Sequence, residues 1–147
     1  MSHRILHYRS PKHHYKAEVC IVWCFDHRFK EILEKYLKHK KIRYPDEVKG
    51  AGGAKALASD KNKNQKKYIF DQIKTSIRLH HTPKIILMTH SDCGGYGGLR
   101  AFKNDPKKEM QKHGADLKKA KSFLKEKLSG SIQIETLFAD FNGLWRM

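Results

Sequence analysis

Two apolar runs along the chain predict the central strands of a parallel sheet. Residues 17–24 and residues 84–89 are nearly unbroken by polar side chains and rich in β-branched residues. Strands that are covered by helices on both faces have this character, whereas half-exposed strands alternate between apolar and polar residues. A weaker apolar set, made of Ile132, Ile134 and the pair Leu137 and Phe138, predicts the last strand.

Apolar residues that recur every three or four positions predict three helices. We expect these helices over residues 27–39, 65–81 and 105–129, with one further helical turn over residues 54–59. The last helix has Asp105 as its N-cap and Pro106 at its first position, and Gly130 is its stop signal. Four of its residues should point inward: Met110, Leu117, Leu124 and Leu128.

The remaining segments carry weaker signals. Residues 42–48 predict a short strand, and Pro45 favours an edge position for it. The glycine-rich residues 50–53 let the backbone approach another segment closely. Residues 1–16 are polar and His-rich and predict an arm or a short first helix, whereas residues 144–147 are too short to assign.

Alternating strands and helices predict an α/β fold: a three-layer sandwich with a mainly parallel central β-sheet. We expect one domain over residues 17–147, preceded by the polar arm of residues 1–16. The arrangement with right-handed crossovers places the strand of residues 17–24 beside the strand of residues 84–89. The chain direction then reverses across the sheet between them. Such a switch point, at the carboxyl ends of the strands, is where α/β sheets bind ligands.

The composition is strongly basic, with 31 Lys and Arg against 15 Asp and Glu and a formal net charge of +16. Such a charge is found in proteins that bind nucleic acids or anionic surfaces. The lysines are spread over helices and loops, however, with little of the aromatic interleaving that a platform for single-stranded nucleic acid needs. We therefore expect a solvated basic surface and keep nucleic-acid binding as the alternative.

The chain shows no apolar stretch of membrane-spanning length and no signal-peptide apolar region at its start, so we expect a cytoplasmic protein. Its three cysteines are an odd number and do not suggest a disulfide framework. Cys20 lies inside a predicted strand and should be a buried apolar residue.

Two short motifs follow the predicted central strands. Cys24-Phe25-Asp26-His27-Arg28 follows the first strand, and His90-Ser91-Asp92-Cys93-Gly94-Gly95 follows the second. Cys24, His90 and Cys93 together form a donor set that suits zinc, and three protein ligands leave a fourth position open, as in catalytic sites. Iron or cobalt could occupy a similar site.

Asp26 and Arg28 are alternate residues and can reach the same side of such a metal. Asp26 could take the fourth ligand position and close the site. A bidentate pair with Arg28 would instead hold Asp26 away and orient it toward the open position. An ordinary ion pair at a strand end is the simpler alternative. His27 could shuttle protons, but we expect a surface histidine at the start of a helix.

Three motifs give the sequence a resemblance to the β class of carbonic anhydrases. They are Cys24-x-Asp26-x-Arg28, Ala51-Gly52-Gly53, and His90-x-x-Cys93-Gly94, in the order of that family and within a match from about residue 17 to near the C-terminus. The resemblance implies a β-carbonic anhydrase-like fold with zinc on Cys24, His90 and Cys93. Asp26 would either bind the zinc in a closed state or pair with Arg28 in an open one. The implied reaction is reversible hydration of carbon dioxide to bicarbonate by a zinc-bound hydroxide.

The sequence also departs from the family. Lys49-Gly50 stands where Arg-Asn is common before Ala-Gly-Gly, and the N-terminal helical arm is reduced. The resemblance implies a homodimer or a higher homo-oligomer. Tyr96-Gly97-Gly98 either shapes the mouth of a pocket or only forms a loop. Two alternatives to the implied function are a related zinc hydrolase acting on carbonyl sulfide or carbon disulfide, and a non-catalytic zinc-stabilised basic binding module.

Overall fold

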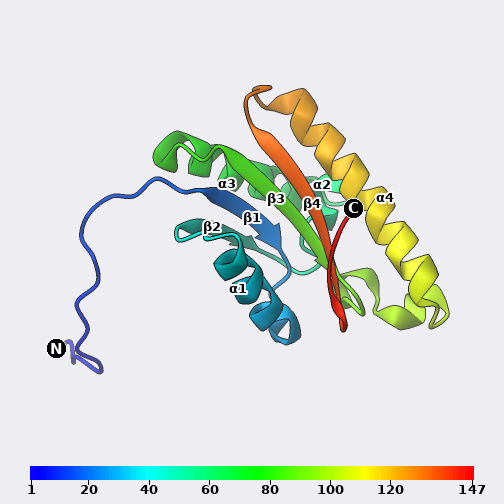
Figure 1. Ribbon diagram of the computed structural model, residues 1–147, viewed down its shortest axis with the longest axis horizontal. Helices are drawn as coiled ribbons and strands as arrows, with labels where there is room; N and C mark the ends of the chain where they lie inside the picture. Colours follow the sequence, from blue (N-terminus) through cyan, green and yellow to red (C-terminus); the bar gives the residue numbers. More distant parts are fainter.

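Five strands form one sheet in the order β2-β1-β3-β4-β5 in the computed structural model, which describes residues 1–147 (Figure 1). Neighbouring strands are parallel except at β4 and β5, which are antiparallel. The strands are β1 Val19–Trp23, β2 Pro45–Lys49, β3 Lys84–His90, β4 Gln133–Asp140 and β5 Gly143–Arg146. The predicted mainly parallel α/β sheet is therefore confirmed, including the first strand beside that of residues 84–89.

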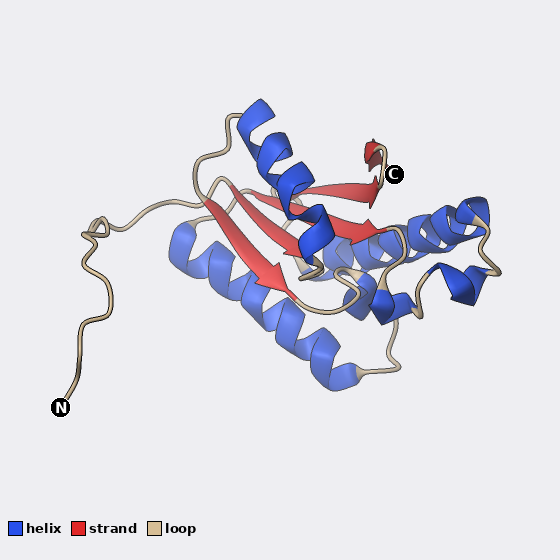
Figure 2. Cartoon of the chain, turned by 90° about the horizontal axis from the view of Figure 1, so that it is seen from below, coloured by secondary structure: helices blue, strands red, loops and turns tan.

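Helices cover both faces of this sheet (Figure 2). Helix α1 (Lys30–His39), which follows a 3-10 turn at His27–Phe29, packs on one face. Helices α2 (Lys55–Ala58), α3 (Lys63–His80) and α4 (Pro106–Lys127) pack on the other. Along β1, Val19, Ile21 and Trp23 face α1, whereas Cys20 and Val22 face the other helices. Both sets of residues are buried, which explains the unbroken apolar run and confirms the three-layer arrangement.

The element boundaries differ from the prediction in small and explicable ways. Strand β2 is an edge strand, as predicted, but it begins at Pro45, where a missing N–H costs little. Ile42 lies outside the strand and packs against the core beneath α1. Helix α3 begins two residues early, because the Asn62 side chain accepts a hydrogen bond from the Gln65 N–H. Helix α4 begins at Pro106 after the Asp105 cap, as predicted, and ends at Lys127.

The two chain ends behave differently. Residues 144–147 were too short to assign from sequence, yet most of them form β5, after a turn in which Asp140 Oδ1 accepts the N–H groups of Asn142 and Gly143. Residues 1–16 contain no helix or strand and are exposed, so the alternative of a short first helix is wrong. Figure 1 shows this segment, which we call the arm, leaving the start of β1 and extending away from the sheet. None of the helices is long and apolar enough to span a membrane.

The parallel topology gives the molecule two unlike ends. Strands β1 to β4 all finish at one end of the sheet, which we call the carboxyl end, and the helices that return from it begin there. At the opposite end, the amino end, the strands begin and α1, α3 and α4 finish. Cys20 is fully buried between these ends, as predicted, and all three cysteines are free.

Candidate metal centre

Three donor side chains converge at the carboxyl end of the sheet. Cys24 follows β1, His90 is the last residue of β3, and Cys93 lies in the next turn. One ligand atom from each lies within 4.8 Å of the others, and the two sulfurs are 4.0 Å apart. All three side chains are buried. The structure thus brings together the three residues that the sequence predicted as metal ligands, as a group that could hold a metal ion.

Two glycines allow the loops around this group to touch. Gly53 has a φ of +56°, and a Cβ there would lie 2.4 Å from the Met88 carbonyl oxygen and 3.0 Å from the Cys24 nitrogen. A Cβ on Gly95 would lie 2.5 Å from the Gly52 nitrogen. The predicted close approach of residues 50–53 is therefore confirmed. It packs the segment after β2 against the loops that carry both cysteines, and a side chain at either glycine would force these loops apart.

The hydrogen bonding of His90 prepares one ring nitrogen as a ligand. His90 Nδ1 lies 2.8 Å from the Ser91 carbonyl oxygen, which can only accept a hydrogen bond, so Nδ1 carries the proton. The other nitrogen, Nε2, is buried and has no hydrogen-bond partner. A buried acceptor without a partner is costly. Its position beside two sulfurs is the arrangement that a metal ion would satisfy.

The two thiols share a proton. A hydrogen bond from the Cys93 thiol lowers the pKa of Cys24 to about 4, and the same bond, together with burial, raises the pKa of Cys93. Ionisation of Cys24 is therefore favoured, and a cation that replaced the shared proton would be bound by two sulfurs. Two thiolates and a neutral imidazole suit zinc, so the donor set fits the predicted metal.

A carboxylate and a guanidinium stand next to the three donors. Arg28 Nη2 donates to Asp26 Oδ2 at 2.7 Å, and Arg28 Nε donates to Asp26 Oδ1 at 3.1 Å. The hydrogen bonds from Arg28 lower the pKa of Asp26 to about 2. Asp26 Oδ2 is 3.9 Å from His90 Nε2. The structure therefore shows the paired arrangement of Asp26, next to the donor group, and a direct ligand role for Asp26 stays a prediction.

Sequence reasoning missed two residues that hold this pair. The side chain and carbonyl oxygen of Asp92 accept hydrogen bonds from Arg28 Nη1 and Nη2 at 3.1 and 3.0 Å. Glu109 on α4 is buried and accepts bonds from the Ser91 hydroxyl and the Asp92 N–H, both at 2.6 Å. The signal for Glu109 was its place on the inward stripe of α4, in register with His113, Leu117 and Leu124.

The match to protein families agrees with this geometry. A family described as "Putative carbonic anhydrase" matches residues 14–146. The chain belongs to this family. Among curated proteins, an uncharacterized protein of Rickettsia conorii is 29% identical over 132 residues, which cover 88% of this chain and 70% of that protein.

Solved structures show which fold this family member adopts. The crystal structure of a β-carbonic anhydrase from Trichomonas vaginalis is similar with a TM-score of 0.60 and 14% identity, over 95% of this chain and 87% of that one. The apo form of a carbon disulfide hydrolase is similar with a TM-score of 0.57 and 14% identity, over 89% of this chain and 79% of that one. The predicted β-carbonic anhydrase-like fold is confirmed.

The motif residue Tyr96 lies in the interior of this carbonic anhydrase-like fold. It is buried, and its ring stacks on that of His113 with centroids 3.8 Å apart. Neither ring nitrogen of His113 has a hydrogen-bond partner, although the side chain is fully buried. Lys55 Nζ lies 4.8 Å from the Tyr96 ring centroid and donates to the Gly95 carbonyl oxygen at 2.6 Å. Tyr96 therefore fills the core behind Cys93.

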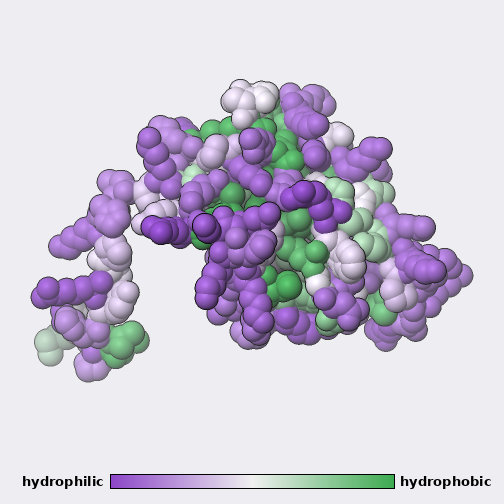
Figure 3. Space-filling model, viewed as in Figure 1, coloured by the Kyte–Doolittle hydropathy of each residue, from purple (hydrophilic) through white to green (hydrophobic).

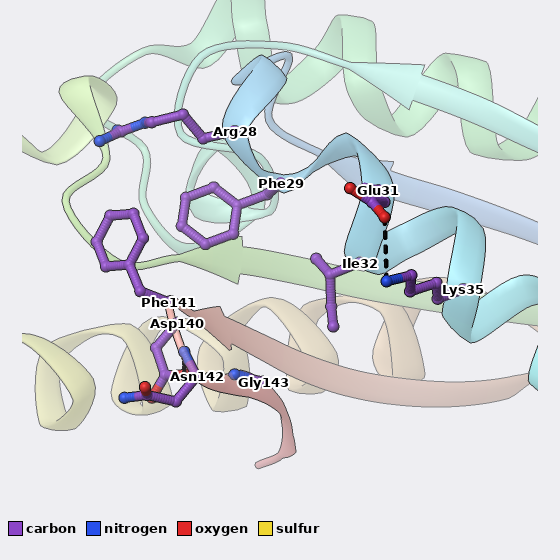
Figure 4. A pocket seen from close by; sticks show the side chains of 9 residues that line it. All are labelled: Arg28, Phe29, Glu31, Ile32, Lys35, Asp140, Phe141, Asn142 and Gly143. Carbon is purple, nitrogen blue, oxygen red and sulfur yellow. Dashed lines mark hydrogen bonds and ion pairs between the residues drawn. The ribbon is translucent and has the colours of Figure 1, made fainter.

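A pocket of about 250 Å³ opens beside the Asp26–Arg28 pair (Figure 4). Arg28, Phe29 and Phe141 lie on its wall, and Glu31 and Lys35 form an ion pair on its rim. The Phe29 ring lies between the pocket and the donor group, because its centroid is 4.5 Å from that of His90 and 5.2 Å from that of Phe141. His27 is exposed, as expected for a surface residue in the 3-10 turn before α1.

Proposed function

We propose that this protein is a zinc enzyme that catalyses the reversible hydration of carbon dioxide to bicarbonate and a proton. The observation that carries the proposal is the buried group of Cys24, His90 and Cys93 with Asp26 held beside it by Arg28. Membership of the carbonic anhydrase family and the likeness to β-carbonic anhydrase structures support the same chemistry.

In this proposal Cys24 Sγ, His90 Nε2 and Cys93 Sγ hold the zinc. Bound zinc supplies Lewis acidity, which lowers the pKa of a water at the open ligand position toward neutrality. The hydrogen bond between His90 Nδ1 and the Ser91 carbonyl keeps Nε2 free for the metal. Both sulfurs serve as thiolates, so loading with metal displaces their shared proton.

Asp26 and Arg28 position the reacting water. Asp26 is ionised over the whole neutral range, because its pKa is lowered to about 2. Its carboxylate can therefore accept a hydrogen bond from the water that attacks carbon dioxide. Arg28 is itself fixed by Asp92, so the carboxylate cannot easily turn toward the metal ligands and close the site. The proton that the reaction releases is then accepted by the buffer.

The decisive experiment is stopped-flow hydration of carbon dioxide on metal-quantified protein from about pH 6.5 to 9. We expect activity in proportion to bound zinc. Cys93→Ser should abolish it, whereas Cys20→Ala, which removes a thiol from the core far from the site, should keep both zinc and activity. Fully zinc-loaded protein with no hydration above buffer would refute the proposal.

A second candidate is hydrolysis of carbon disulfide or carbonyl sulfide by the same site. The similarity to a carbon disulfide hydrolase structure favours it, because folds like this one then occur both in a carbonic anhydrase and in a carbon disulfide hydrolase. Each carbon disulfide would consume two waters and release carbon dioxide and two molecules of hydrogen sulfide. Sulfide release from zinc-loaded protein that exceeds its carbon dioxide hydration would favour this candidate. Bound zinc without either turnover would favour the non-catalytic zinc-stabilised module.

We also propose that the chain forms a homo-oligomer. Phe25 and Phe141 are 66% and 63% exposed at the carboxyl end, and aromatic residues are enriched in protein interfaces. Strands β2 and β5 are also free sheet edges. Sedimentation velocity at micromolar concentration should show a dimer or larger species, and Phe141→Ser should shift it toward monomer.

A further inference from the structure

The amino end of the sheet collects several exposed basic side chains that form no ion pair. The last turn of α1 contributes Lys38, and the segment between α1 and β2 contributes Lys40, Lys41 and Arg43; none of the four forms an ion pair. Arg78, in the last turn of α3, is exposed and also unpaired. The nearby carboxylate of Glu18 accepts the backbone N–H groups of Arg43 and Tyr44 at 2.5 and 2.8 Å, so it is occupied by the backbone.

The arm adds a second set of positive charges at the same end. Residues 1–16 contain no acidic residue, four histidines, and four exposed cationic side chains: Arg4, Arg9, Lys12 and Lys16. Figure 3 shows the arm as mainly hydrophilic, with apolar atoms near its free end. The exposed large aliphatic residues of the arm are Met1, Ile5 and Leu6, and Tyr8 and Tyr15 are its exposed aromatic residues.

The root of the arm is fastened between the α1–β2 segment and the end of α3. Tyr15 donates a hydrogen bond to Asp46 at 2.7 Å, and its ring lies 5.7 Å from that of Tyr44 and 4.2 Å from that of His80. The Ala17 N–H donates to the His80 carbonyl, and the Glu18 N–H donates to the Tyr44 carbonyl. The arm, the α1–β2 segment and the end of α3 therefore form one continuous region, which we call the amino-end basic surface.

Helix dipoles explain only part of this charge. Cations near a helix C-terminus are stabilising by about 0.3–1 kcal/mol each, and α1 and α3 both end here. That effect accounts for Lys38 and Arg78. It fades beyond the last turn, so it does not account for Arg43 or for the arm, which contains no helix. Mutual repulsion among these groups is a cost that a bound polyanion would remove.

The tyrosines indicate which polyanion fits. Tyr15 and Tyr44 are stacked with an interplanar angle of 23°, are 37% and 46% exposed, and are followed and preceded in the chain by Lys16 and Arg43, respectively. Aromatic faces beside a cationic track bind single strands by stacking bases and contacting phosphates. A lipid surface would instead call for an amphipathic helix, whereas the arm is not helical and contains Pro11.

We propose that the amino-end basic surface binds single-stranded nucleic acid, with phosphates on Lys38, Lys40, Arg43 and the arm and with bases against Tyr15 and Tyr44. This surface lies at the opposite end of the sheet from the candidate metal centre. The proposal is therefore independent of the proposed enzymatic activity.

The test is fluorescence anisotropy of a labelled oligothymidylate of about 20 nucleotides with the full-length, metal-loaded protein. Binding should weaken steeply between about 50 and 200 mM salt. Replacing Lys38, Lys40 and Arg43 together with Gln should weaken binding at the lower salt about tenfold or more. It should also reduce the slope of log K against log salt by about 2, near 0.7 for each lost phosphate contact. The same exchange at Arg4, Arg9 and Lys12 should act in the same direction.

The matched control removes three charges at the carboxyl end. Lys63, Arg100 and Lys107 are exposed and form no ion pair, and exchanging all three for Gln gives the same net charge. This variant should weaken binding less than about threefold, an effect of net charge alone. Circular dichroism of every variant separates a lost contact from a lost fold, and zinc content should be equal in all of them.

Three outcomes would overturn the proposal. The first is no binding of the oligonucleotide at low salt, and the second is equal weakening by the control and the amino-end variants. The third is tighter binding to vesicles of phosphatidylserine and phosphatidylcholine than to the oligonucleotide, which would assign the surface to membranes. Tyr44→Ala adds a charge-neutral check, because loss of one stacked base should weaken binding about tenfold with an unchanged salt slope.

Discussion

The two ends of the sheet use charge in opposite ways. At the carboxyl end, the charged groups around the donor group are bonded to one another: Arg28 to Asp26 and Asp92, and Glu109 to the turn between His90 and Cys93. At the amino end, Glu135 pairs with Lys84 and Arg146, and Asp46 pairs with His80. Five exposed basic side chains at this end nevertheless form no ion pair: Lys38, Lys40, Lys41, Arg43 and Arg78. Paired charges of fixed geometry suit catalysis on a small molecule, whereas unpaired cations suit a large anionic partner.

The largest effect should come from opening the backbone contact at the carboxyl end. In Gly53→Ala the new Cβ meets the Met88 carbonyl, and the residue keeps a positive φ. Backbone strain and overpacking together should lower the free energy of unfolding by about 4 kcal/mol. Urea denaturation measures it. Gly94→Ala is the control, since nothing lies within 4 Å of a Cβ there, and similar losses in both variants would contradict the importance of this contact.

The next largest effect should come from breaking the charge pairing itself. Arg28→Ala frees Asp26 and leaves Asp92 without its ion-pair partner. If the proposed hydration is correct, kcat/KM should fall by about 100-fold while bound zinc stays stoichiometric. Lys35→Ala, on the rim of the same pocket, removes an equal charge and should change kcat/KM less than about twofold. Full activity in Arg28→Ala would show that the pairing does not matter for turnover.

A smaller loss is expected from Glu109→Gln. Its amide can accept only one of the two hydrogen bonds that the carboxylate accepts from the Ser91 hydroxyl and the Asp92 N–H. We expect a loss of about 2 kcal/mol in stability and weaker zinc retention against a chelator. Glu126→Gln on the exposed side of α4 should stay within about 0.5 kcal/mol. Unchanged zinc retention in Glu109→Gln would show that Glu109 on α4 does not stabilise the metal centre.

The smallest effect concerns the fastening of the arm at the amino end. Tyr15→Phe removes one hydrogen bond to Asp46 and should cost about 1 kcal/mol at neutral pH, with Tyr44→Phe as a neutral control. Burial opposes ionisation of Asp46, but bonds from Ser76, Tyr15 and His80 outweigh it and lower its pKa. Stabilisation from this carboxylate is thus present above its unfolded pKa and lost as pH falls through the lower folded pKa. The cost of Tyr15→Phe in urea denaturation should shrink in acid, and a constant cost would contradict this role.

The sequence predicted those parts of the molecule whose signal is local. The strands of residues 17–24 and 84–89 follow from continuous apolar runs, and Asp105 with Pro106 marks the start of α4. The proximity of Cys24, His90 and Cys93 could be predicted from sequence, because parallel strands place their carboxyl ends side by side. Their motifs also occur in a known order, which made the family recognisable.

The parts that could not be predicted depend on pairing between distant segments. Strand β5 has four residues and exists through its ladder with β4, so its own composition carries little signal. Ile42 is apolar like a strand residue, yet it lies in a loop and packs against the core on the α1 side of the sheet. Glutamate is a residue type that favours helix surfaces. Glu109 is buried because its carboxylate accepts hydrogen bonds from the Asp92 N–H and the Ser91 hydroxyl, which would otherwise lack partners.

The buried imidazole of His113, which has no hydrogen-bond partner, limits the stability of the whole molecule in acid. Burial is the main cause that lowers its pKa to about 3, against the opposing influence of the Asp116 carboxylate. In the unfolded chain this histidine has an ordinary pKa, so at acidic pH the unfolded chain binds a proton that the folded chain does not bind. Acidification below that ordinary pKa therefore favours unfolding. His113 and Glu109 lie one turn apart on α4. Protonation of the His113 ring in the core would destabilise the packing of α4, the helix whose Glu109 holds the turn between His90 and Cys93. We therefore expect unfolding and loss of the metal centre to occur together in acid.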